Sequence, residues 1–144
     1  MRLFTIGFTK TSAEHFFSRL IDAGVVTMVD VRLNNVSQLA GFAKREDLKY
    51  FLKSLANIEY RHALQLAPTQ TLLDAYRKAH GSWSDYEKQF RELLVSRAVE
   101  TTLRASEFDR ACLLCSEDKP DHCHRRIVAE YMQARWADVH IVHL

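Results

Sequence analysis

Hydrophobic and polar residues follow two alternating patterns along this chain of 144 residues. Short runs rich in apolar and β-branched residues predict strands over residues 2–8, 25–32, 58–64, 109–117 and 138–144. Between the runs, apolar residues recur every three or four positions and predict helices over residues 9–24, 45–57, 69–81, 84–106 and 122–136. The second run is almost continuously apolar, which is typical of a central parallel strand.

Strands that alternate with helices indicate an α/β fold. We expect a single domain over residues 1–144, with an open sheet of about five mostly parallel strands. Helices would cover both faces of the sheet, in a Rossmann-like or flavodoxin-like arrangement. Ligands of such sheets bind beyond the carboxyl ends of the strands.

Two helix starts carry capping-box spacing. Thr11 with Glu14 predicts the start of the first helix, and Ser84 with Glu87 predicts the start of the long helix over residues 84–106. Both pairs place a hydroxyl three residues before a glutamate.

Composition narrows the class of protein. An apolar fraction of 47% is ordinary for a folded chain, and a net charge of +2 disfavours a nucleic-acid binder, which usually has a strongly basic face. No apolar stretch approaches the roughly 20 residues that span a membrane. Three cysteines without a visible secretory signal predict reduced thiols, and we expect a cytoplasmic protein with no membrane partner.

Polar and reactive side chains follow the ends of three predicted strands and open the last helix. Because parallel strands end at one edge of a sheet, we expect these residues to lie near one another. They are Thr5, Gly7, Asp30, Arg32, Cys115, Ser116, Glu117, Cys123, His124 and Arg125.

Charged residues end the second and fourth strands. Asp30 and Arg32 flank Val31 and point to the same face, so they form an ion pair, or Arg32 holds a substrate anion while Asp30 orients it or moves a proton. Glu117 is a candidate general acid or base, or a contact for a nucleotide; the alternative is a solvated loop carboxylate.

All three cysteines lie in the stretch CLLCSEDKPDHCHRR, residues 112–126. Side chains alternate along a strand, so Cys112 points away from Cys115. This geometry disfavours a zinc knuckle that uses both, and Cys112 is expected to be a small core residue.

Cys123 is the candidate nucleophile. With Asp121 as the N-cap, Cys123 and His124 would lie in the first turn of the last helix. The helix dipole, His124 and Arg125 would then lower the pKa of the thiol. The alternative is a buried, inert cysteine.

Cations at a helix N-terminus oppose the macrodipole, and a bound anion would compensate for them. Arg126 can pair with Glu130 four residues later. Arg125 is therefore the better candidate for a ligand contact.

Three segments resemble domain-of-unknown-function family 488: TIGFTKTSAEHFFSRL, DVRLNNVSQLAGFAKREDLKYFL and CLLCSEDKPDHCHRRIVAEY. The resemblance implies that the strand-end residues named above, apart from Ser116, occupy the family's signature positions. The chain departs from many relatives at Phe8, where they have His or Tyr. It departs again at residues 66–68, where they have Leu-Gly-Gly.

Three functions compete. The favoured one is an enzyme for an anionic, phosphate- or nucleotide-like substrate, with Cys123, His124, Glu117 and Asp30 as catalytic residues, and with no cofactor assigned. Its ligand-binding residues would be Thr5, Gly7, Arg32, Cys115, Ser116 and Arg125. The second is a metal-binding protein that uses Cys115, Cys123 and His124; in a regular helix the last two diverge by about 100°, so a distorted turn is required. The third is a nucleic-acid-binding module built on the basic residues between positions 44 and 53.

Overall fold

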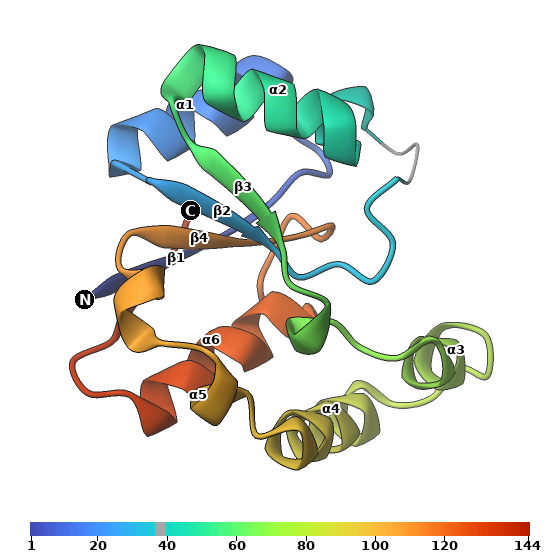
Figure 1. Ribbon diagram of the computed structural model, residues 1–144. Coiled ribbons are helices and arrows are strands. Elements are labelled where there is room, and N and C mark those ends of the chain that lie inside the picture. Colours follow the sequence, from blue (N-terminus) through green and yellow to red (C-terminus); the bar gives the residue numbers. More distant parts are fainter. Residues whose placement is uncertain (37–39) are drawn as a thin grey trace.

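The structure is a computed structural model that describes residues 1–36 and 40–144. These residues form one five-stranded sheet with helices on both faces (Figure 1). The strands are β1 (Arg2–Gly7), β2 (Thr27–Asp30), β3 (Glu59–His62), β4 (Ala111–Cys115) and β5 (His140–His143). The α-helices are α1 (Ala13–Ala23), α2 (Arg45–Ala56), α3 (Gln70–Arg77), α4 (Trp83–Arg97), α5 (Val99–Thr102) and α6 (His124–Arg135).

The strand order is β3-β2-β4-β1-β5, and every pairing is parallel. This confirms the predicted α/β sheet. All five residues of β4 are buried, because β4 lies at the centre of the sheet and is covered on both faces. The register pairs Gly7 with Cys115 and Asp30 with Leu114, so three strands end together at one edge.

Two hydrophobic clusters divide the helices between the faces. Helices α1 and α2 pack on one face, and α4, α5 and α6 pack on the other, with α3 beside α4 (Figure 1). The chain therefore leaves β2 towards one face and leaves β4 towards the other. These two strands are neighbours, and such a point in an open sheet is where ligands bind.

The predicted helix starts are wrong by one or two residues. Ser12 and Ser82, and not Thr11 and Ser84, are the N-caps of α1 and α4, and their hydroxyls accept the backbone N–H of the third residue beyond. The spacing of a hydroxyl and an acid identified the helices correctly. The capping residue was misplaced because a nearby serine caps each helix instead, one residue later in α1 and two residues earlier in α4.

The helix expected over residues 84–106 is broken. Ala98 adopts a left-handed conformation with φ 47°, which ends α4 and starts α5 in a new direction. The break turns Val99 and Leu103 into the core. Arg97 holds the end of α4 in place by donating to the carbonyls of Gln65 and Ala67 at 2.9 and 2.6 Å.

Among the residues that the structure describes, none of the helices has the length and apolar character of a membrane span.

Candidate functional site: a buried Cys2His cluster beside two cavities

Three buried side chains, Cys115, Cys123 and His124, converge where β4 ends and α6 begins and form the Cys2His cluster. Cys115 is the last residue of β4, Cys123 directly precedes α6, and His124 is the first residue of α6. Their possible ligand atoms, two Sγ and one imidazole nitrogen, all lie within 4.8 Å of one another. The sequence grouped these residues correctly at one edge of the sheet.

Two contacts set the orientation of the His124 ring. Nε2 lies 2.6 Å from the carbonyl oxygen of Val31, and Nδ1 lies 3.3 Å from Sγ of Cys115. Because a carbonyl only accepts, Nε2 carries the proton and the lone pair of Nδ1 faces the cysteines. Metal-binding imidazoles are held in the same way, by donating their other N–H to a carbonyl or carboxylate.

The backbone of Cys123 allows it to share this point with His124. Cys123 is the N-cap of α6, with extended angles of φ −135° and ψ 135°. The expected cap at Asp121 is therefore wrong, and Cys123 lies outside the first turn. Side chains of consecutive helical residues diverge by about 100°, but an extended residue followed by a helical one is free of this constraint. The distortion that a metal site requires is present.

Burial and mutual hydrogen bonding shift the pKa values of the two thiols in opposite directions. Burial raises the pKa of Cys115, but hydrogen bonds from the Cys123 thiol and the Ser116 backbone N–H outweigh it, so this pKa lies below its ordinary value. Burial raises the pKa of Cys123, and its neighbour Cys115 raises it further. The lowered pKa that the sequence predicted for Cys123 is therefore wrong, because the side chain is only 2% exposed.

His124 supplies a neutral donor. Burial lowers the pKa of His124, which favours the uncharged ring at neutral pH. A neutral imidazole and two thiols, one of them prone to ionise, form a donor set suited to a soft divalent cation.

Two cavities of about 260 and 380 Å³ adjoin the cluster. The smaller is lined by Leu73, Tyr76, Arg77, Trp83, Tyr86, Cys115, Glu117, His122, Cys123 and His124. The larger is lined by Thr9, Arg32, Leu33, Asn34, Pro68, Gln70, Leu73, Arg77, Cys115, Ser116, Glu117 and His124. Their shared walls place the cluster between them.

Arg77 and Glu117 lie on the walls that the two cavities share. Within the described ranges, neither the Arg77 guanidinium nor the Glu117 carboxylate forms a hydrogen bond or ion pair with the protein. Both residues are exposed. Glu117 thus lies where the sequence predicted, whereas Arg77 was not expected at the site.

Asp30 and Arg32 form the predicted ion pair on one face of the sheet. Arg32 donates from Nε and Nη2 to the two carboxylate oxygens at 2.9 and 2.8 Å, and Tyr60 donates its hydroxyl to the same carboxylate at 2.6 Å. The Arg32 guanidinium also lies 5.0 Å from the centre of the Phe8 ring. These contacts make the pair part of the framework; its role towards a ligand stays a prediction.

Arg125 is fully buried and holds the loop that joins β4 to α6. Its Nη1 donates to the Glu117 carbonyl at 2.5 Å, and its Nε lies 3.4 Å from the Thr5 hydroxyl. Neither Arg125 nor Thr5 lines the two cavities, and their predicted ligand contacts stay predictions. Arg126 pairs with Glu130 at 3.0 Å, as the sequence indicated.

The structure confirms the expectation for Cys112, and it adds aromatic residues that the sequence did not assign to the site. Cys112 is a free, buried core residue that packs with α1 and α2, on the opposite face from Cys115, as predicted. The sequence did not assign Tyr76, Trp83, Tyr86 or His122 to the site. The positions of the first three depend on how α3 and α4 fold over the sheet edge, which no local pattern encodes, whereas His122 lies in the loop between β4 and α6.

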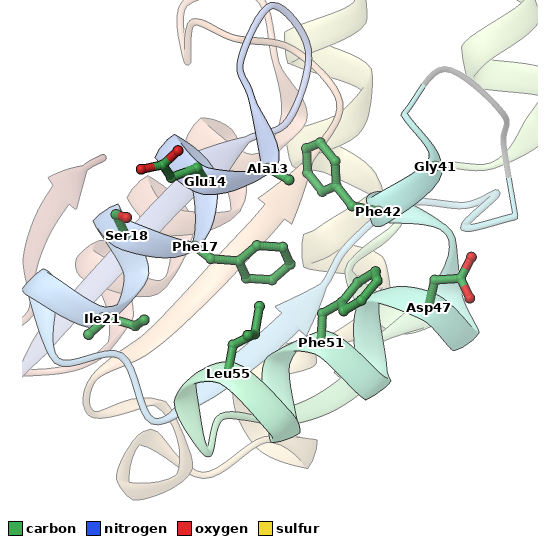
Figure 2. A pocket seen from close by; sticks show the side chains of 10 residues that line it. All are labelled: Ala13, Glu14, Phe17, Ser18, Ile21, Gly41, Phe42, Asp47, Phe51 and Leu55. Carbon is green, nitrogen blue, oxygen red and sulfur yellow. The ribbon is translucent and has the colours of Figure 1, made fainter.

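A cavity of about 650 Å³ lies elsewhere, between α1 and α2. Figure 2 shows the rings of Phe17, Phe42 and Phe51 turned towards one another, with the carboxylates of Glu14 and Asp47 turned outwards. It is larger than the other two, but its walls contain no cysteine or histidine. The cysteines and the histidine of the candidate site therefore lie apart from this cavity.

The comparisons with known proteins bear on the family only. No curated protein and no solved structure matches the chain. One family model, described as Domain of unknown function DUF488, matches residues 12–132 and so includes the Cys2His cluster and most of the cavity walls. The chain belongs to this family, Domain of unknown function DUF488.

Proposed function

We propose that the protein is an enzyme that binds one soft divalent metal ion, such as Zn²⁺, through Cys115, Cys123 and His124. The carrying observation is that two Sγ atoms and an imidazole nitrogen lie within 4.8 Å of one another in a buried place. With Zn–S near 2.3 Å and Zn–N near 2.0–2.1 Å, the ligand atoms of a tetrahedral site are about 3.6–3.8 Å apart. Small side-chain movements bring the three atoms to that spacing.

Three protein ligands leave a fourth position for water or substrate, which is the pattern of catalytic zinc sites. Such a metal lowers the pKa of bound water to about 7. Glu117, on the wall that both cavities share, would act as the general base and acid of a hydrolysis. It would accept one proton from the attacking water, whose oxygen bonds to the substrate, and would return that proton to the leaving group. Arg77 would hold the anionic part of the substrate. The reaction class is hydrolysis.

A thiol enzyme is the second candidate. The pKa of Cys115 is lowered, and its Sγ lies 3.3 Å from Nδ1 of His124, so this pair resembles a nucleophile and its base. In this alternative Cys115 is the nucleophile, whereas the sequence suggested Cys123.

Metal content per chain decides between the two. The protein is purified without chelator or affinity metal, and bound metals are measured by mass spectrometry beside a count of titratable thiols. We expect about one zinc or iron per chain. Reconstitution with Co²⁺ should give the absorption of a tetrahedral thiolate site.

Cys115→Ser, Cys123→Ser and His124→Ala should each lose the metal. Cys112→Ala is the matched control, because Cys112 is equally buried but lies on the other face of the sheet, and it should keep the metal. Three titratable thiols, no bound metal and no uptake of added Zn²⁺ or Co²⁺ would overturn the metal centre and favour the thiol enzyme.

A further inference from the structure

The two cavities beside the cluster have walls of different chemistry. The smaller one has an aromatic wall, which comprises Tyr76, Trp83, Tyr86 and His122. The described residues give the larger one no aromatic wall: Thr9, Asn34, Gln70 and Ser116 line it together with the apolar residues Leu33 and Pro68. A ligand that reaches the cluster therefore meets aromatic rings on one side and hydrogen-bonding groups on the other.

The aromatic wall has the form of a short stack. The Trp83 ring lies 5.0 Å from His122 at an interplanar angle of 20°, and 5.1 Å from Tyr86 at 27°. Tyr86 is almost fully buried, whereas Trp83 is half-buried and His122 is exposed. The stack is thus anchored in the core and open at the cavity. Flat rings bind to such surfaces, and a base stacked on an aromatic side chain contributes about 1–3 kcal/mol.

Arg77 stands where the two walls meet, since it lines both cavities. It ends α3, and the described chain offers its guanidinium no carboxylate. A guanidinium binds phosphate or carboxylate through paired N–H donors, and also stacks on flat rings. The position suits the junction between a ring and an anionic group.

We propose that the substrate is a flat heteroaromatic ring joined to an anionic group, the chemistry of a nucleoside monophosphate. The ring stacks on His122, the exposed end of the stack, which Trp83 supports from behind. Arg77 holds the anion, and the rest of the ligand extends along the polar groups of the larger cavity. The inference rests on the proposed function for the reaction at the cluster, but binding of the ring and the anion is measurable without turnover.

Trp83 provides the reporter. The chain has two tryptophans, and Trp136 packs against Phe108, outside both cavities, so Trp136→Phe leaves Trp83 as the only indole. Fluorescence of this variant is titrated with AMP and CMP, and with adenosine and ribose 5-phosphate as fragments. We expect AMP or CMP to quench Trp83, and each fragment to bind at least tenfold more weakly than the intact nucleotide.

Substitutions separate the two contacts. Arg77→Gln should weaken AMP binding at least tenfold and leave adenosine unchanged, whereas Lys78→Gln, the neighbouring exposed cation outside both cavities, should change neither. Trp83→Leu, measured by calorimetry, should weaken AMP and adenosine alike, and Trp83→Phe should recover most of the loss. Thermal melts identify any variant that fails to fold.

The same samples are assayed for metal. Nucleotide binding to a chain that takes up no metal would overturn the proposed metal centre and leave the ligand class standing. A metal-loaded protein that binds none of the four probes would overturn the ligand class alone. Ribose 5-phosphate binding as tightly as AMP would refute the role of the aromatic wall.

Discussion

Gly7 and Glu117 approach each other so closely that a Cβ on Gly7 would lie 1.5 Å from the Glu117 carbonyl oxygen. The same carbonyl accepts a hydrogen bond from Arg125. The end of β1 therefore supports the loop that carries Glu117 and leads from Cys115 to Cys123. Glycine at position 7 is required by space, because any side chain would push this loop off the strand.

Gly7→Ala should accordingly displace the loop and weaken the cluster. We expect a loss of unfolding free energy of about 1–3 kcal/mol, the usual cost of forcing extra atoms into a packed site, together with weaker metal binding. Urea unfolding and metal content measure the two effects. Gly41→Ala is the control, since a Cβ there meets nothing within 4 Å. Equal stability of both variants would contradict the packing argument.

Arg125 and Arg126 are adjacent arginines with different expected effects. Arg125→Met removes a fully buried guanidinium and leaves the Glu117 carbonyl without this donor, so we expect a loss of about 2–4 kcal/mol in chemical unfolding. Arg126→Met breaks partly exposed ion pairs and should cost about 1 kcal/mol or less. If Arg125→Met has the same unfolding free energy as the wild type, Arg125 does not stabilise the loop, and this result would favour its predicted role as a ligand contact.

The buried pair of Asp30 and Arg32 yields a third stability prediction. Asp30→Asn leaves the Arg32 guanidinium buried without its counter-charge, which typically costs about 3–5 kcal/mol. Asp74→Asn removes an exposed helix pair with Lys78 and should cost about 0.5 kcal/mol or less. Denaturant midpoints compare the two; similar values would show that Asp30 acts on a ligand and not on the framework.

Acid should weaken the contact between α4 and α6. Burial raises the pKa of Glu130, but hydrogen bonds from Arg126 and Arg91 outweigh it and leave this pKa below its ordinary value of about 4.3. A carboxyl with a depressed folded-state pKa stabilises the fold above its unfolded pKa, and the stabilisation is lost as pH falls through the folded pKa. The contribution should be about 1 kcal/mol or less, because Glu130 is 36% exposed.

Urea unfolding between about pH 3 and pH 7 tests this contribution. Glu130→Gln should be less stable than the wild type near neutral pH, and the gap should close at the acidic end. Glu92→Gln, on the exposed side of α4, is the control and should follow the wild type throughout. A gap that persists unchanged at the acidic end would assign the effect to packing.

The sequence by itself determined the alternation of strands and helices and the collection of reactive groups at one edge. Both are consequences of short-range periodicity: apolar runs such as residues 25–32 form buried strands, and parallel strands end together. The opposite orientations of Cys112 and Cys115 follow from the pleat of a single strand and were also predictable.

Tertiary structure decided the rest, because it depends on partners far apart in the chain. His124 is oriented by the Val31 carbonyl, 93 residues away, and Cys123 stays extended beside it, which no local capping pattern reveals. The left-handed conformation of Ala98 directs Val99 and Leu103 into the hydrophobic core. Arg77 and Trp83 reach the cluster only because α3 and α4 fold over the edge where β4 ends, and helix docking is governed by buried surface and not by local pattern.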